Sequence, residues 1–302
     1  MALASGSRAF MRDGASIPLI GFGTYLLSPE QAKAAVLEAL RVGYRHIDTA
    51  EGYKTESHVG EALRESGVPR EEVFITSKVF PGNPVWHHAP KTFDGCIAAC
   101  EGSLARLGTS YLDLYLIHAP FCQAERLDQW RALLELQRLG SVRSVGVSNY
   151  AVAHLEEIRA AGLTMPAVNQ VEMHPFCSQA KLCEYMAAHK VLPVAYSSLA
   201  PLSSWREGQP SGKQSRGANM IGGQPPFPDL ASRHGASEAQ ILLRWAVQKG
   251  FPVLPKSASP ERIRQNFELF HFELSDEDMA ALDALDQGLA VAWAPLDPTS
   301  VL

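Results

Sequence analysis

The amino-acid sequence predicts a (β/α)8 barrel, also called a TIM barrel, of the α/β class. Eight short runs rich in Val, Ile and Tyr alternate with longer segments in which apolar residues recur at helical spacing, and this alternation is typical of a barrel. The short runs are apolar on both faces, like strands of a parallel sheet that helices cover. The chain has 302 residues, enough for one barrel of about 250 residues, so we expect a single domain over residues 1–302. A doubly wound sheet is the alternative fold.

Each expected strand is a short apolar run that is bounded by turn residues. The strands are expected at residues 17–25, 44–50, 72–80, 112–118, 142–149, 167–173, 192–199 and 251–257.

The helices between these runs have recognisable ends. In the first one, Ser28 is a suitable N-cap, Pro29 suits the first turn, and Gly43 ends the helix. In the segment 237–250, four apolar residues are expected on one face: Ile241, Leu242, Trp245 and Ala246. Further helices are expected within 54–67, 90–108, 126–140, 151–162 and 178–190, and after the N-cap Ser259.

Three segments lie outside the eight repeating units. Residues 8–20 place Asp13-Gly14 between two apolar runs, which predicts a hairpin that plugs the bottom of the barrel. Residues 275–286 predict an additional C-terminal helix. Residues 200–227 are rich in Pro, Gly and Ser and too long for an ordinary connection, so we expect a functional loop there. It would bring three apolar side chains toward the site: Trp205, Met220 and Phe227.

Composition excludes several classes of function. The 27 basic and 32 acidic residues give a net charge of −5, which argues against a nucleic-acid partner. No apolar run approaches the roughly 18 residues that span a bilayer, and the N-terminus lacks the apolar core of a signal peptide. We therefore expect a cytoplasmic protein with no membrane contact. The five cysteines lack metal-ligand spacing, so neither a disulfide nor a metal site is expected.

Titratable side chains follow three successive strands. Asp48 ends the second strand, Tyr53 lies in the loop after it, Lys78 ends the third strand and His118 ends the fourth. Because catalytic groups of barrels lie at the C-terminal ends of strands, these side chains are expected to converge. Taken singly, Asp48 also suits a helix cap, Lys78 and Asp48 a simple ion pair, and His118 a buried core histidine. Together they suggest proton donation, with the lysine lowering the tyrosine pKa.

Other familiar motifs are absent. No GxSxG sequence marks a serine nucleophile, and there is no Walker loop. The run Gly21-Phe22-Gly23-Thr24-Tyr25-Leu26 lacks the third glycine of a dinucleotide fingerprint and does not open a helix. Glu172 is the one obvious strand-end carboxylate for a barrel isomerase or hydrolase, and we expect a structural role for it.

Several longer motifs resemble the aldo-keto reductase family. They are GFGT (21–24), HIDTAEGYKTESHVGEALRESG (46–67), LIHAP (116–120), VGVSNY (145–150), NQVEMHP (169–175), PKSASPERIRQNF (255–267) and FELS (272–275). The resemblance extends over nearly the whole chain. It implies a (β/α)8 barrel that binds a nicotinamide cofactor without a Rossmann fold, and it implies reduction of aldehydes or ketones to alcohols.

The resemblance also implies roles for individual residues. Tyr53 is the proton donor, Lys78 paired with Asp48 tunes it, and His118 orients the substrate carbonyl. Ser148, Asn149 and Gln170 hold the cofactor's carboxamide, and Tyr196 stacks on the nicotinamide ring. The full set of positions implied around this end of the cofactor is Gly23, Thr24, Tyr25, Ser148, Asn149, Gln170, Tyr196, Ser197 and Leu199.

The other end of the cofactor is implied to lie at the start of the helix after the eighth strand. Lys256, Ser257 and Arg262 would hold a 2′-phosphate, which favours NADPH over NADH. A helix N-terminus already favours an anion, and the planar arginine fork suits a phosphate. Gln265 and Asn266 would contact the adenine.

Departures from the family pattern concern the substrate. The common His-Trp-Pro reads His118-Ala119-Pro120, so an aromatic wall is missing. The short segment 121–126 is similar to bacterial and lower-eukaryotic members, whereas mammalian aldose and hydroxysteroid reductases have a long loop. Trp86 and Trp293 could reach the pocket or pack on the outside of the barrel. We expect a hydrophobic pocket for bulky aldehydes or ketones and, as the family implies, a monomer.

Two alternatives have the same fold. One is a non-catalytic NADPH-binding scaffold or sensor, which the intact Asp48, Tyr53, Lys78 and His118 argue against. The other is a steroid double-bond reductase. That subgroup has glutamate in place of the histidine, so His118 argues against it.

Overall fold

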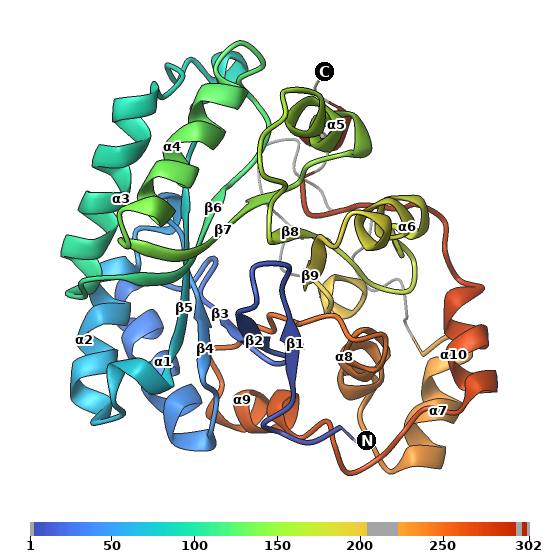
Figure 1. Ribbon diagram of the computed structural model, residues 1–302. Coiled ribbons are helices and arrows are strands. Elements are labelled where there is room, and N and C mark those ends of the chain that lie inside the picture. The colour runs from blue at the N-terminus through green and yellow to red at the C-terminus, as the bar shows by residue number, and fades with distance from the viewer. Residues whose placement is uncertain (1–2, 204–222, 294–297, 301–302) are drawn as a thin grey trace.

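The computed structural model describes residues 3–203, 223–293 and 298–300. Its main sheet has seven parallel strands whose spatial order follows the order of the chain, and helices surround it (Figure 1). A doubly wound sheet would reverse its order partway, so the barrel prediction is confirmed. The strands are β3 (Phe22–Gly23), β4 (His46–Asp48), β5 (Phe74–Val79), β6 (Leu112–Ile117), β7 (Val142–Ser148), β8 (Val168–Glu172) and β9 (Leu192–Tyr196).

The eighth position of the barrel is closed by a bridge instead of the strand expected at 251–257. Val253 forms parallel bridges with Ile20 on one side and Ala195 on the other. The Val253 N–H donates to the Leu19 carbonyl at 2.9 Å, and the Ala195 N–H donates to the Pro252 carbonyl at 2.7 Å. Proline at 252 and 255 has no N–H to donate, which shortens the ladder to a bridge.

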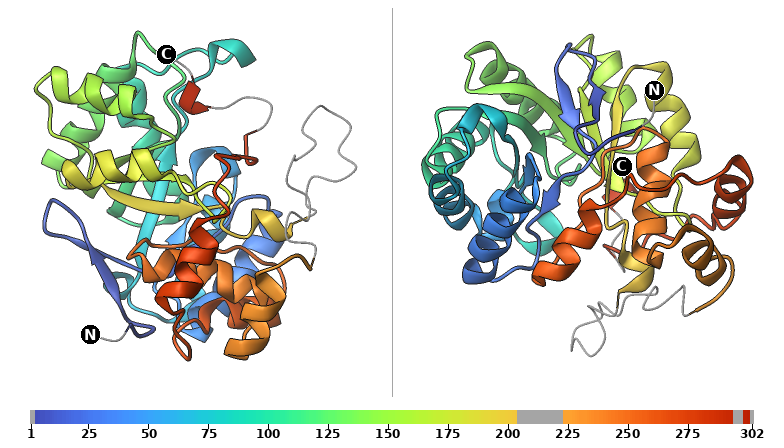
Figure 2. Two further views of the ribbon diagram at one scale, coloured as in Figure 1. Left: turned by 90° about the vertical axis from the view of Figure 1, so that its right-hand side faces the viewer. Right: turned by 90° about the horizontal axis from the view of Figure 1, so that it is seen from below.

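The expected hairpin covers one end of the barrel (Figures 1 and 2). Its strands β1 (Arg8–Phe10) and β2 (Ser16–Pro18) pair antiparallel. Met11 and Ile17 are buried with Phe74 and Val168, which begin β5 and β8, so the hairpin closes the bottom as predicted. Residues 17 and 18 belong to this hairpin, and the first barrel strand is therefore shorter than the expected 17–25.

Most helices begin and end at the predicted signals. The Ser28 hydroxyl accepts the Gln31 N–H, the Gln31 side chain accepts the Ser28 N–H, and Gly43 ends the helix with φ of 121°. The four residues expected on the inner face of the helix after 237 are fully buried: Ile241, Leu242, Trp245 and Ala246. The α-helices are α1 (Pro29–Val42), α2 (Glu56–Ser66), α3 (Phe93–Leu107), α4 (Arg126–Arg138), α5 (Val152–Ala160), α6 (Ala180–Ala188), α7 (Phe227–His234), α8 (Glu238–Gln248), α9 (Pro260–Phe267) and α10 (Asp276–Asp283).

Short 3₁₀ helices complete the described elements. They are η1 (Glu51–Tyr53), η2 (Arg70–Glu72), η3 (Pro84–Trp86), η4 (Ala200–Leu202) and η5 (Pro298–Ser300). Among the helices that the structure describes, none combines the length and apolar character needed to cross a bilayer.

The end of the expected functional loop differs from the prediction. Phe227 begins α7, a helix that was not predicted, and its buried ring stacks on Phe176 with centroids 6.0 Å apart. The expectation that Phe227 faces the site is therefore wrong, because its ring belongs to the core. Trp205 and Met220 lie outside the described residues. The additional C-terminal helix is present as α10, capped by Ser275.

Candidate active site

A cavity of about 390 Å³ opens at the C-terminal ends of the barrel strands. In this fold, catalytic groups gather at that face. The cavity lining includes one residue at or just after each of five strands: Asp48, His118, Ser148, Gln170 and Tyr196.

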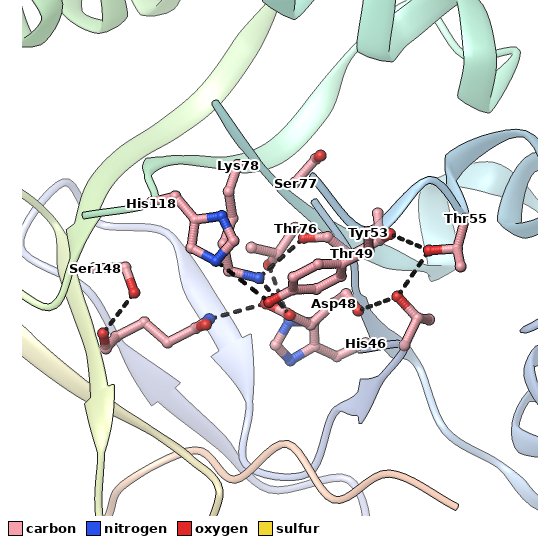
Figure 3. A network of polar contacts seen from close by, with 12 residues as sticks. His46, Asp48, Thr49, Tyr53, Thr55, Thr76, Ser77, Lys78, His118 and Ser148 are labelled. Atoms are coloured by element: carbon pink, nitrogen blue, oxygen red, sulfur yellow. Dashed lines mark hydrogen bonds and ion pairs between the residues drawn. The ribbon is translucent and has the colours of Figure 1, made fainter. Parts of the chain in front are cut away.

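A buried ion pair lies at the base of the cavity (Figure 3). The Lys78 Nζ donates to Asp48 Oδ1 at 2.5 Å and to the Thr49 carbonyl at 2.9 Å, and Lys78 is fully buried. Gln170 Nε2 donates to the other Asp48 oxygen at 2.8 Å. Burial lowers the pKa of Lys78, and the Asp48 carboxylate opposes this by favouring the ammonium form. The pair is therefore held from both sides by hydrogen bonds.

Tyr53 lies above this pair, at the end of η1. Its hydroxyl oxygen is 3.5 Å from His118 Nε2, and the Lys78 Nζ is 5.0 Å from its ring centroid. Figure 3 shows the labelled Asp48, Tyr53, Lys78 and His118 side chains converging on one point. The structure thus brings together the residues that strand-end position and family resemblance select.

The expected lowering of the Tyr53 pKa is wrong for this structure. Burial raises the pKa of the phenol well above its ordinary value, and the nearby Asp48 and Tyr25 add to the rise. The Lys78 ammonium is directed toward Asp48 and the Thr49 carbonyl, not toward the phenol oxygen. The Tyr53 hydroxyl therefore keeps its proton at neutral pH, which is the state required of a proton donor.

His118 is neutral in the same environment. Burial and the Lys78 charge lower its pKa to about 3. Its Nδ1 is buried without a hydrogen-bond partner among the described residues, while its Nε2 faces Tyr53. A neutral imidazole has one N–H and one lone pair, so His118 can bond a carbonyl oxygen without bringing a charge.

Stability should depend on pH because the barrel interior favours the neutral form of two histidines, the fully buried His46 and the partly exposed His118. His46, in β4, contacts Thr76 Oγ1 at 3.0 Å, and burial lowers its pKa to about 3, as for His118. An unfolded histidine has a pKa near 6.5, so between that value and about 3 the unfolded chain binds more protons. We expect the free energy of unfolding to fall as pH drops through this window, by up to about 1.4 kcal/mol per pH unit for each histidine.

Urea unfolding at pH 7, 6, 5 and 4 measures this slope. The variant His46→Asn should have a shallower slope than the wild type, whatever its stability at pH 7. A slope identical to the wild type would show that His46 is not buried in the neutral form.

Polar side chains of β7 and β8 form a connected group beside the ion pair. The Ser148 hydroxyl donates to the Gln170 carbonyl at 2.8 Å, and Asn149 Nδ2 donates to the Ser148 oxygen at 3.0 Å. The Tyr196 hydroxyl donates to Asn149 Oδ1 at 2.6 Å. Amide, hydroxyl and aromatic groups therefore line this part of the cavity, which suits a planar ring that carries an amide.

Two cations mark the opposite end of the site. Neither Lys256 nor Arg262 forms a salt bridge within the described part of the chain, and burial together with the Arg262 charge lowers the pKa of Lys256. Ser259 caps α9 by accepting the Arg262 N–H at 3.4 Å, and the Ser257 hydroxyl accepts the Ser259 N–H at 3.0 Å. Two adjacent cations at a helix N-terminus form a suitable site for an anion.

The structure places the predicted site residues in two groups. Twelve predicted residues line the cavity: Gly23, Tyr25, Asp48, Tyr53, His118, Ser148, Asn149, Gln170, Tyr196, Ser197, Leu199 and Lys256. Six do not: Thr24, Lys78, Ser257, Arg262, Gln265 and Asn266. Thr24 is buried and donates to the Asp48 carbonyl at 3.1 Å, so its role here is to support the site.

Nine uncharged residues of the described lining were not predicted from the sequence. These residues are Leu26, Gly52, Phe80, Ser198, Ala200, Ser203, Leu254, Pro255 and Ala292. None carries a titratable group, and their one signal is proximity along the chain to predicted site residues. Trp86 and Trp293 both line the cavity, with rings 6.3 Å apart and nearly parallel, which settles the question that the sequence left open.

Comparison with known proteins agrees with this geometry. The model of the Aldo/keto reductase family matches residues 19–287. An aldo-keto reductase of Mycolicibacterium smegmatis is 38% identical over 93% of this chain and 94% of its own length. Morphine 6-dehydrogenase of Pseudomonas putida is 36% identical over 95% of this chain and 94% of its own.

Solved structures give the same answer. An aldo-keto reductase of Bombyx mori in complex with NADP is similar with a TM-score of 0.84 and 30% identity, over 97% of this chain and 96% of that one. The family model, the relatives and the fold agree over nearly the whole chain. The chain therefore belongs to the aldo/keto reductase family.

Proposed function

We propose that this chain is an NADPH-dependent carbonyl reductase that converts aldehydes or ketones to alcohols, with Tyr53 as proton donor. The observation that carries this proposal is the half-buried Tyr53, whose hydroxyl lies 3.5 Å from His118 Nε2 in the wall of a cavity. The raised pKa of this phenol keeps it protonated at neutral pH. An O–H donor beside a neutral imidazole suits the protonation of an oxygen on which negative charge develops.

The residues present fit a nicotinamide cofactor. The cavity extends from Tyr53 and His118 to Lys256, and the Ser198 hydroxyl in its wall has no hydrogen-bond partner among the described residues. A Cβ at Gly23 would come within 3.1 Å of the Leu254 carbonyl oxygen, so a side chain here would crowd this part of the wall. Lys256 and Arg262 would bind the phosphate end, and Ser148, Asn149 and Gln170 the carboxamide. When bound, NADPH would supply the hydride.

The protein's own contribution is to position the carbonyl and to provide a proton. His118 and Tyr53 bond the carbonyl oxygen and hold its carbon toward the nicotinamide end of the cavity. As the carbon is reduced, the Tyr53 O–H bond breaks and the proton goes to the substrate oxygen, which gives the alcohol. The Lys78 ammonium, held by Asp48, stabilises the phenolate that is left, and solvent then returns the proton.

The lining favours carbonyl compounds with apolar or aromatic substituents. Around Tyr53 and His118, the described lining includes Phe80, Trp86 and Trp293, and the one lysine of the described lining, Lys256, lies at the proposed phosphate end. A substrate carboxylate would have no partner there. The similarity to a relative that is named morphine 6-dehydrogenase supports a pocket for bulky compounds.

The preference for NADPH has its own test. Because Arg262 is proposed to contact the 2′-phosphate, Arg262→Ala should weaken NADPH binding by about 1.5–3 kcal/mol and NADH binding much less. Fluorescence titration with both cofactors measures the two dissociation constants. Arg264→Ala, on the same helix but paired with Glu38, is the control. Equal losses for NADPH and NADH would contradict the assignment.

The direct test of function follows NADPH absorbance with a panel of aromatic and aliphatic aldehydes, ketones and dicarbonyls. Turnover supports the reductase. Tight NADPH binding without turnover of any compound favours the alternative, a non-catalytic scaffold or sensor. We further propose a cytoplasmic, single-domain monomer, and light scattering of the purified protein tests its oligomeric state.

A further inference from the structure

The segment that follows α10 leads to the cavity along the loop after β8. We call residues 286–293 the C-terminal strap. The Asp286 carboxylate accepts hydrogen bonds from the Ser178 N–H and hydroxyl. The Gln287 and Leu289 N–H groups both donate to the Phe176 carbonyl, at 3.1 and 3.0 Å. The strap is therefore attached to the barrel at successive points that approach the cavity.

Glu172 provides the attachment nearest the cavity. Its Oε1 accepts the Val291 N–H and its Oε2 the Ala292 N–H, both at 2.8 Å. His174 Nε2 lies 3.1 Å from Oε1. The carboxylate ends β8 and is almost fully buried, at 3% exposure. Hydrogen bonds to a buried charge are strong, and losing these two would leave His174 as the remaining described partner of the carboxylate.

The residue after this attachment is Trp293. Its indole Nε1–H donates to the Tyr196 hydroxyl at 3.0 Å. Its ring is edge-on to His118, with centroids 6.2 Å apart, and 5.5 Å from the Phe121 ring. A bidentate clamp on the two preceding residues thus fixes an aromatic ring beside His118, which in turn faces the candidate proton donor Tyr53.

Ala119 explains why there is room for this ring. Trp293 packs against the apolar cluster of Ala119, Phe121 and Cys122. Position 119 is where the common family pattern has a tryptophan, and the methyl group of alanine leaves space in front of it. The aromatic wall that the sequence suggests is missing is therefore supplied by the far end of the chain.

We propose that Trp293 is a specificity-determining residue for carbonyl compounds with aromatic or bulky apolar substituents, and that Glu172 is the positioning residue that holds it. This inference rests on the proposed carbonyl reduction. It gives Glu172 a task toward the substrate beyond the structural role that the sequence suggests, although the side chain touches neither substrate nor cofactor.

The first test is the isosteric variant Glu172→Gln. A neutral amide accepts at one oxygen and presents an NH₂ group to the other backbone N–H, so the clamp is lost without a change of volume. We expect KM for benzaldehyde to rise roughly tenfold, with kcat changed less than twofold. KM for propanal and the Kd of NADPH should stay as in the wild type. Glu135→Gln, at a surface pair with Arg138, is the control.

A double-mutant cycle separates positioning from general stability. If Glu172 acts through Trp293, Glu172→Gln should have no further effect on KM for benzaldehyde in a Trp293→Ala background. If Glu172→Gln raises KM by the same factor with and without Trp293, or raises KM for propanal equally, the proposal is overturned. Should Glu172→Gln not fold, Ala292→Pro removes one of the two N–H donors and takes its place in the cycle.

A measurement without turnover keeps this proposal distinct from the proposed function. The difference in acrylamide quenching between the wild type and Trp293→Phe reports the exposure of Trp293. The same difference, measured in the Glu172→Gln background with and without Trp293→Phe, should be larger. An unchanged difference would overturn the positioning role. Absence of carbonyl turnover in the wild type would instead contradict the proposed function and leave the quenching result to stand on its own.

Discussion

Replacing Tyr53 by phenylalanine is expected to lower kcat by roughly 10²–10⁴-fold, the usual contribution of a positioned proton donor. The change removes only the hydroxyl that lies 3.5 Å from His118 Nε2. The ring keeps its contacts with Tyr25 and with the Lys78 ammonium, at 5.0 Å in each case. The Kd of NADPH should therefore change by less than about twofold, since an edge hydroxyl is the sole loss.

Steady-state turnover of NADPH with the best aldehyde, together with fluorescence titration of the cofactor, checks this result. Tyr185→Phe is the matched control, because its hydroxyl bonds Glu156 on the outside of the barrel. Normal turnover by Tyr53→Phe would remove Tyr53 from the role of proton donor.

Replacing Lys78 by methionine should have the largest effect on stability. Lys78 is fully buried and bonded to Asp48 at 2.5 Å, and removal of one partner of a buried pair costs about 3–5 kcal/mol. The remaining Asp48 carboxylate would also repel the phenolate that forms when Tyr53 gives up its proton. We therefore expect kcat to fall by roughly 10²–10³-fold in the protein that still folds.

A second substitution separates the two effects of Lys78→Met. Adding Asp48→Asn removes the uncompensated carboxylate, and the free energy of unfolding in urea should recover part of the loss. Turnover should not recover, because no cation is restored below Tyr53. If kcat returned together with stability, Lys78 would act only by keeping the fold intact.

The sequence predicted the parts of the site that depend on topology. Asp48, Lys78 and His118 each end or follow a strand, and a parallel barrel places all such ends on one face. Helix caps such as Ser28 and Gly43 were equally readable, because capping is a local interaction of neighbouring residues.

The parts that were missed depend on contacts between distant segments. The rise in the Tyr53 pKa comes from burial, which no local pattern near residue 53 encodes. The packing of Trp293 on Ala119 joins the C-terminal strap to the end of β6. The eighth strand is shortened to a bridge because the prolines at 252 and 255 have no N–H to donate. This effect could not be predicted from the sequence, because it depends on which residues pair with this segment.

The bridge at Val253 affects where the barrel opens locally. The seam closed through the doubly bridged residue Val253 has a shorter ladder than those of β5 with β6 and of β6 with β7, so its amides should exchange with solvent earlier than those of these inner strands. Lys256 lies three positions beyond Val253. An anion bound at Lys256 would stabilise the closed seam. Part of the free energy of cofactor binding would therefore appear as slower amide hydrogen exchange around Val253.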